Sequence, residues 1–208
     1  MEWPLWTKPD SGDQTTISIL HAAERRRYHS CAVGAMMNKE SYRNELDRPD
    51  LQWQTSPRHE APNESLRWLL VADLVSSRIH LGLSSDGWWV APGPRAATEF
   101  KPGIPLVFLL PILETPLDEA RARLAEGLRQ KLLTEKFLAT FPFEDVVSCG
   151  LESHSNKWES LALKWAEQLP GSAKLQSVLQ SAANRAATQT LRHAAQKLLA
   201  SKRKEFAS

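Results

Sequence analysis

The chain has 208 residues, of which 42% are apolar and 24% charged, so it can bury a sizeable core as one domain or as two small ones. Its net charge of +2 hides an uneven distribution, because residues 173–204 hold seven Lys/Arg and no Asp or Glu, whereas residues 1–172 hold 19 Lys/Arg against 23 Asp/Glu and carry −4. This acidic remainder argues against a broad nucleic-acid groove that would extend over the whole chain.

Cysteine content and apolar runs bear on the location of the protein. Cys31 and Cys149 are too few for a disulfide framework. The first residues lack the basic-then-apolar pattern of a signal peptide. The longest apolar run, 104–113, contains Pro105 and Pro111 and is too short to cross a bilayer. We therefore expect a cytoplasmic protein with reduced thiols, no membrane contact and no cofactor.

The first third of the chain divides into two segments by composition. Residues 1–46 are predicted to form an N-terminal helical segment after an irregular start, and residues 47–62 contain three prolines and read as a linker or long loop. Trp53 stands alone in this loop and either anchors it or contacts a partner. The remaining 63–208 is predicted as the main helical domain, with a single domain over 1–208 as the alternative.

The next segment is predicted to be helical. A helix beginning at Asn63 or Ser65 and ending near Gly82 fits the helical spacing of its leucines, which are Leu66, Leu69, Leu70 and Leu74. Asp86-Gly87 is a strong hairpin signal between alternating flanks, so a small β-hairpin near 79–90 is the alternative. Residues 91–105 are rich in Pro and Gly and irregular, and 106–113 are predicted as a buried strand or extended plug.

Two helices are expected between Thr115 and Pro170. The first is capped by Thr115, has Pro116 at its first helical position and runs to about Thr140, since Pro142 forbids its continuation. Residues 143–153 are read as a connection. The second helix begins at Ser155 or Asn156, and its buried face is predicted from spacing to consist of Trp158, Leu161, Ala162, Trp165, Ala166 and Leu169. The short turn at Pro170-Gly171 makes it an antiparallel neighbour of the helix that follows.

The basic C-terminal stretch, 172–204, is predicted as one long helix or as two with a break near 187–190. Ser172 is a natural N-cap. On an unbroken helix Lys174, Arg185 and Arg192 fall on one line opposite the apolar arc. The fold class predicted from all these segments is mostly α: an irregular helical domain with a C-terminal helical hairpin and at most one small β-hairpin.

No constellation of residues indicates catalysis or metal binding. His29, Cys31, Cys149 and His154 do not match structural-zinc spacings. Neither a nucleophile elbow nor a phosphate-binding glycine loop is present in the sequence. The sequence therefore predicts no catalytic residue and no metal ligand.

The function predicted from the sequence is that of a non-catalytic helical adaptor or assembly subunit, which binds through exposed tryptophan-containing loops and the basic C-terminal helix. The partner is expected to be a protein with an acidic surface, or nucleic acid. The residues predicted to bind it are Trp53, Lys174, Arg185, Arg192, Lys202, Arg203 and Lys204. The alternatives are a nucleic-acid-binding module that uses the same helix and an enzyme with an unrecognised site.

Overall fold

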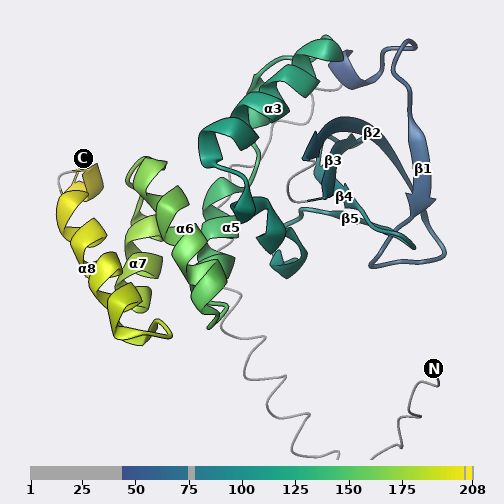
Figure 1. The fold of residues 1–208 in the computed structure, drawn as a ribbon. Helices are drawn as coiled ribbons and strands as arrows, with labels where there is room; N and C mark the ends of the chain where they lie inside the picture. The colour runs from purple at the N-terminus through teal and green to yellow at the C-terminus, as the bar shows by residue number, and fades with distance from the viewer. Residues whose placement is uncertain (1–43, 75–77, 204, 208) are drawn as a thin grey trace, which may run out of the picture. The chain divides into compact units, whose positions relative to one another are not determined.

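The computed structural model describes residues 44–74, 78–203 and 205–207, which all belong to a compact unit, Ala35–Ser208. The described chain begins with a helical turn at 44–46, then has five strands, and longer helices follow (Figure 1). The strands are β1 Gln54–Pro57, β2 Ser65–Leu74, β3 Ile79–Ser84, β4 Trp89–Pro92 and β5 Ala97–Glu99. The helices are the 3-10 helix η2 Val107–Glu114, then α3 Leu117–Gln130, α4 Lys136–Ala139, α5 Phe143–Leu151, α6 Asn156–Gln168, α7 Ala173–Arg185, α8 Gln189–Ser201 and the 3-10 helix η3 Glu205–Ala207.

The predicted fold class is wrong, because the strands form one antiparallel sheet in the order β1-β2-β3-β4-β5. The largest error falls on β2, which was predicted as a helix over 63–82. Both faces of this strand are covered by other parts of the chain, so Leu66 and Trp68 are buried on one face and Leu69 on the other. A strand buried on both faces gives a continuous apolar run, and such a run matches helical spacing by coincidence.

The sheet curls so that its first and last strands meet. An isolated bridge joins Arg58 to Ala97, and the backbone N–H of His59 donates to the carbonyl of Ala97 at 2.9 Å. The curled sheet encloses a small apolar cluster of Leu66, Trp68, Val90 and Ala97. The opposite face contributes Leu69, Leu83 and Trp89 to the main core, which they share with the helices. The sheet therefore separates two apolar clusters.

The alternative of a hairpin near 79–90 is confirmed. β3 and β4 pair through Gly82 with Val90 and Leu83 with Trp89. Gly87 has a φ of +82°, a conformation that glycine adopts without the cost a side chain would add. The Ser84 hydroxyl accepts a hydrogen bond from the Trp88 N–H at 3.1 Å and fastens the turn.

The predicted loop and plug segments also contain regular structure. The segment 47–62 includes β1, which pairs with β2, and 106–113 lies mostly in η2 and is not extended. The division into domains at these residues stays a prediction, and 1–43 lie outside the described residues. Among the described residues, no helix has both the length and the apolar character needed to span a membrane.

The helix that was predicted from Thr115 and Pro116 is shorter than expected. α3 begins at Leu117, with Pro116 and not Thr115 in the N-cap position and without a side-chain cap hydrogen bond, and it ends at Gln130 instead of Thr140. Leu132, with a φ of +54°, reverses the chain before α4. The predicted connection 143–153 is mostly helix α5, with Phe143 and Val146 buried on its inner side. Short helices of this kind offer too few turns for a clear periodic pattern.

The helix with the clearest apolar pattern, α6, begins at Asn156 as predicted. Trp165 is buried, and its Nε1 donates to the Thr115 carbonyl at 2.9 Å, while Trp158 is only half-buried. The predicted antiparallel pairing of α6 with the helix that follows it, α7, is not among the main contacts of the described residues. α7 contacts mainly α8 and α5, and α6 contacts mainly α5, α8 and η2.

One close approach joins the sheet to the helices. α3 crosses β2 at Gly127, where an added Cβ would lie 1.9 Å from the Val71 carbonyl oxygen and 3.1 Å from its side chain. Val71 lies at the irregularity in the β2–β3 register, between Leu70 and Ala72. Only a residue without a side chain allows the helix backbone to lie this close to the strand.

We expect Gly127→Ala to destabilise the protein by about 3 kcal/mol, because the new methyl group would displace strand backbone that cannot yield as a flexible side chain would. At an open helical position the same change would stabilise by about 1 kcal/mol through helix propensity. The measurement is denaturant unfolding, with Ala122→Gly at an exposed position of α3 as the control for propensity alone. A gain in stability for Gly127→Ala would show that α3 does not lie against β2 at this point.

Candidate functional site

The basic C-terminal stretch folds as two helices and not as one. α7 begins after Ser172, whose hydroxyl accepts from the Leu175 N–H at 3.0 Å. Ala186 then leaves the helix with a ψ of 152°, and Thr188 caps α8 by accepting from the Leu191 N–H at 3.3 Å. The alternative with a break is therefore confirmed, and the two helices pack together as a hairpin (Figure 1).

The reversal of the chain separates the three residues that an unbroken helix would have aligned. Lys174 lies in the first turn of α7, whereas Arg185 and Arg192 lie on either side of the turn between the helices. The predicted single row is therefore wrong. The absence of acids is unaffected, since residues 173–203 contain six Lys/Arg and no Asp or Glu.

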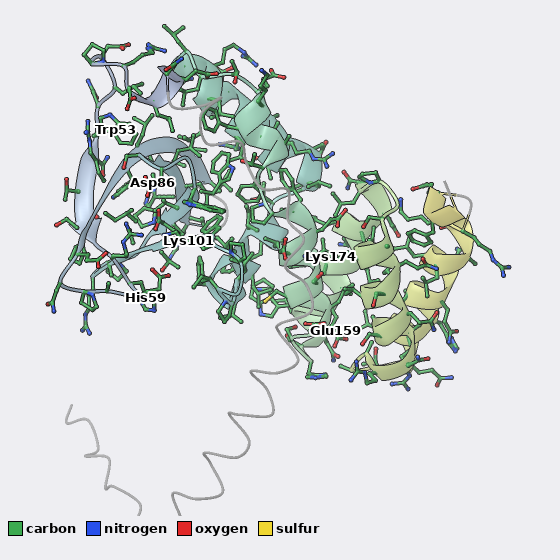
Figure 2. The ribbon with its side chains drawn as sticks, turned by 180° about the vertical axis from the view of Figure 1, so that it is seen from behind. Trp53, His59, Asp86, Lys101, Glu159 and Lys174 are labelled. Atoms are coloured by element: carbon green, nitrogen blue, oxygen red, sulfur yellow. The ribbon has the colours of Figure 1, made fainter. Side chains whose placement is uncertain are left out.

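Lys174 is used inside the protein. Its ammonium forms an ion pair with Asp145 of α5, and its side chain is about three-quarters covered. Figure 2 shows Lys174 and Glu159 where the C-terminal helices meet their neighbours. The pair fixes the start of α7 to α5, so Lys174 has a structural role independent of any partner.

Lys202 is buried at the end of α8. Its Nζ donates to the Leu169 carbonyl at 2.7 Å and pairs with Glu205 at 3.1 Å. The same carboxylate oxygen of Glu205 accepts from the Gly171 N–H at 3.0 Å. These bonds fasten the end of the hairpin to the turn between α6 and α7, and they satisfy a carbonyl that the end of α6 leaves open.

The turn between α7 and α8 is fastened by a buried acid. Glu159 of α6 is fully buried, and its Oε2 accepts from the Ala187 N–H at 2.9 Å. Its other oxygen has no hydrogen-bond partner among the described residues. Arg192 is half-buried and donates to the Ala186 carbonyl at 2.8 Å, where a cation is favoured by the C-terminal end of α7.

Three cations of the hairpin remain on the surface. Arg185, Lys197 and Arg203 are exposed, and none forms an ion pair with another described residue. Arg185 donates to the Ser181 hydroxyl of its own helix at 2.5 Å. Lys204, which was also predicted to bind a partner, lies outside the described residues. We call the exposed residues of α7 and α8, together with Arg203, the hairpin surface: Ala173, Gln176, Ser177, Gln180, Asn184, Arg185, Gln189, Thr190, His193, Ala194, Gln196, Lys197, Ala200, Ser201 and Arg203.

Trp53, the predicted contact residue of the 47–62 segment, is half-buried. Its ring packs against the main core, and the Arg67 guanidinium lies 4.8 Å from the ring centroid. The ring nitrogen is covered and has no partner among the described residues. This geometry supports the anchoring role that the sequence left open, and a role in binding stays a prediction.

A second buried charge lies where the sheet closes. Glu99 of β5 is fully buried, and one of its oxygens pairs with Arg58 and with Lys101, the latter at 2.6 Å. Arg58 belongs to the bridge that joins the end of β1 to β5. The Arg58–Glu99 ion pair joins the two edges of the sheet, and the Lys101 pair adds a second cation, since an unpaired carboxylate at this depth would cost several kcal/mol.

The described residues offer no metal-binding group of three or more His, Cys, Asp or Glu. His29 and Cys31 lie outside them. Burial raises the pKa of the Cys149 thiol to about 11, with a smaller contribution from Glu152, so at neutral pH it is a protonated thiol and a poor ligand or nucleophile. His154 is exposed at a positive φ of 53°.

A shallow groove of about 360 Å³ runs between β2 and α3. Its charged side chains include Asp73, Glu119 and Arg123, and the last two pair with each other. Asp73 lies 3.4 Å from the His80 ring. The groove therefore brings together no unpaired set of groups suited to acid–base work.

Sequence reasoning found the basic hairpin but missed the residues that hold it. Nothing in the spacing of Asp145 or Glu159 indicates that either would meet α7 or the turn after it. Lys197 was not among the predicted binding residues. It is exposed because the buried residues of α8, Ala195 and Leu198, lie on another side of the helix.

No protein-family model, no curated protein and no solved structure matches this chain.

We expect Lys202→Gln to cost about 2 kcal/mol of unfolding free energy, because a shorter neutral side chain leaves the Leu169 carbonyl and Glu205 without their buried donor. The matched control is Lys197→Gln on the same helix, where an exposed, unpaired cation should change stability by less than about 0.5 kcal/mol. Chemical denaturation measures both. Equal losses for the two variants would contradict the division between anchoring and surface cations.

Proposed function

We propose that the protein is a non-catalytic binding module, an adaptor or assembly subunit, which contacts an acidic partner through the hairpin surface. The observation that carries the proposal is the absence of acids over residues 173–203, combined with three exposed cations that have no ion pair among the described residues: Arg185, Lys197 and Arg203.

The contrast with the rest of the described chain supports this function. Residues 44–172 hold 13 Lys/Arg and 18 Asp/Glu, a net charge of −5, and many of these cations are paired with acids there. Exposed charges add little to folding, typically about 0–1 kcal/mol for a pair. Folding stability therefore gives no reason for a pair of helices to lack acids on its exposed side.

The anchors of the hairpin support the same function. Lys174, Lys202 and Glu159 use their charges against the neighbouring helices, which fixes the hairpin and leaves its outer side uncovered by other described residues. A rigid surface binds at a lower entropic cost than a segment that must first become ordered. The catalytic alternative has no supporting group of side chains among the described residues.

The expected location belongs to the proposal as well. Cys149, the one cysteine within the described residues, is a free thiol, which agrees with a reducing compartment such as the cytoplasm.

The test replaces the three exposed cations together, as Arg185→Gln, Lys197→Gln and Arg203→Gln, which we call the hairpin variant. The full chain carrying an affinity tag is used to purify partners from its native cell at low and high salt. We expect a stoichiometric acidic partner with the wild type that is lost with the hairpin variant and at high salt, because the contact is electrostatic.

The matched control removes three exposed cations outside the hairpin, as Arg78→Gln, Arg95→Gln and Lys136→Gln, and is called the body variant. These residues are exposed and form no ion pair among the described residues. The body variant should retain the partner. Loss of the partner with the body variant and its retention with the hairpin variant would refute the proposed surface.

A further inference from the structure

We infer that the acidic partner of the hairpin surface is a short carboxylate-bearing protein segment and not a nucleic acid. The inference rests on the proposed function and names the chemical class of its partner. Three features of the hairpin carry it: the number of exposed cations, the length of the helices, and the chemistry of the side chains between the cations.

Among the described residues of the hairpin, three exposed cations have no ion pair, which is few for nucleic acid. Each phosphate that a protein neutralises on a single strand contributes a slope of about −0.7 to log K against log salt. Arg185, Lys197 and Arg203 would give a slope of about −2, whereas roughly 6–10 phosphate contacts would give a slope of about −4 to −7. Lys174 and Lys202 are already engaged by Asp145 and Glu205 and cannot add to this number without releasing the anchors.

The hairpin is also short. α7 and α8 have 13 residues each, which corresponds to about 20 Å at 1.5 Å per residue. A strand with phosphates about every 3.4 Å along its axis would pass beyond the helices within roughly six nucleotides. Beyond the helices the described chain offers no further acid-free surface, since residues 44–172 carry a net charge of −5 and include the exposed Glu167 of α6. A short acidic segment does not need to extend beyond the helices.

The side chains between the cations are mostly amides. Gln176, Gln180 and Asn184 are exposed on α7, and Gln189 and Gln196 are exposed on α8. Each amide both donates and accepts hydrogen bonds, whereas phosphate oxygens only accept. A peptide offers N–H donors as well as carboxylate acceptors, so it can satisfy both kinds of group on this surface. A phosphate backbone offers these amide oxygens no donor, and donors would have to come from the bases alone.

The inference is tested by titrating the full chain with two fluorescent probes at near-physiological salt. One is a short peptide of alternating Glu and Gln, and the other is a single-stranded DNA oligonucleotide of the same net charge. We expect the peptide to bind about tenfold more tightly than the DNA. The hairpin variant should weaken peptide binding about tenfold, and the body variant should leave it unchanged.

Circular dichroism of both variants establishes that they are folded, and a peptide with every Glu replaced by Gln shows how much of the binding depends on charge. DNA binding that is as tight as peptide binding, or tighter, and is lost in the hairpin variant would overturn the inference while leaving the proposed surface in place. If the hairpin variant changes the binding of neither probe, or if neither probe binds, both the inference and the proposed function are wrong.

Discussion

The contact on which the described structure depends most is the close approach of Gly127 to the Val71 carbonyl. α3 can lie against β2 only because Gly127 has no side chain, and this contact is where the sheet and the helices meet most extensively. Behind it, the buried residues on the helix-facing side of the sheet and those of α3 to α8 form the main apolar cluster, which includes Leu69 and Leu124. A side chain at this point would hold the helix away from the strand and open that cluster to water.

Polar contacts, in addition to the apolar core, hold the C-terminal hairpin in place. In the C-terminal hairpin, α7 buries Leu175, Val178 and Leu179 in the core, whereas α8 buries only Ala195 and Leu198. The hairpin is also held in place by the ion pair of Lys174, the buried amine of Lys202 and the carboxylate of Glu159. Because these contacts face inward, the remaining cations of the two helices lie on the outer surface. Residues 173–203 contain no acids, so these cations have no acidic neighbour on the hairpin itself. Some charged residues of the hairpin thus anchor it to the neighbouring helices, and the others form its proposed binding surface.

The sequence correctly predicted the helices that have a long amphipathic face and a clear start signal. The prediction failed for a strand buried on both faces, because such a strand does not alternate between apolar and polar residues. The sequence predicted α6 and the start of α3 because each has apolar residues at helical spacing after a clear start signal. Trp165 belongs to this pattern in α6 and Leu117 in α3. β2 was missed because leucines on both faces of a buried strand produce helix-like spacing. The binding surface was found only in part. The charge distribution along the chain revealed the acid-free stretch. It could not show that Lys174 pairs with Asp145, or that Lys202 contacts Leu169 and Glu205, because only folding brings these partners together.

The central claim is that the cations of the hairpin are divided between internal anchors and a free surface. The most direct measurement is the rate at which each lysine of the wild-type protein reacts with an amine-specific reagent, followed by mass spectrometry. We predict that Lys197 reacts at the rate of an exposed amine, that the buried Lys202 is strongly protected and that the partly covered Lys174 is intermediate, because the reagent must reach the amine. Equal rates for Lys197 and Lys202 would contradict the account, since they would show that the end of α8 is not anchored.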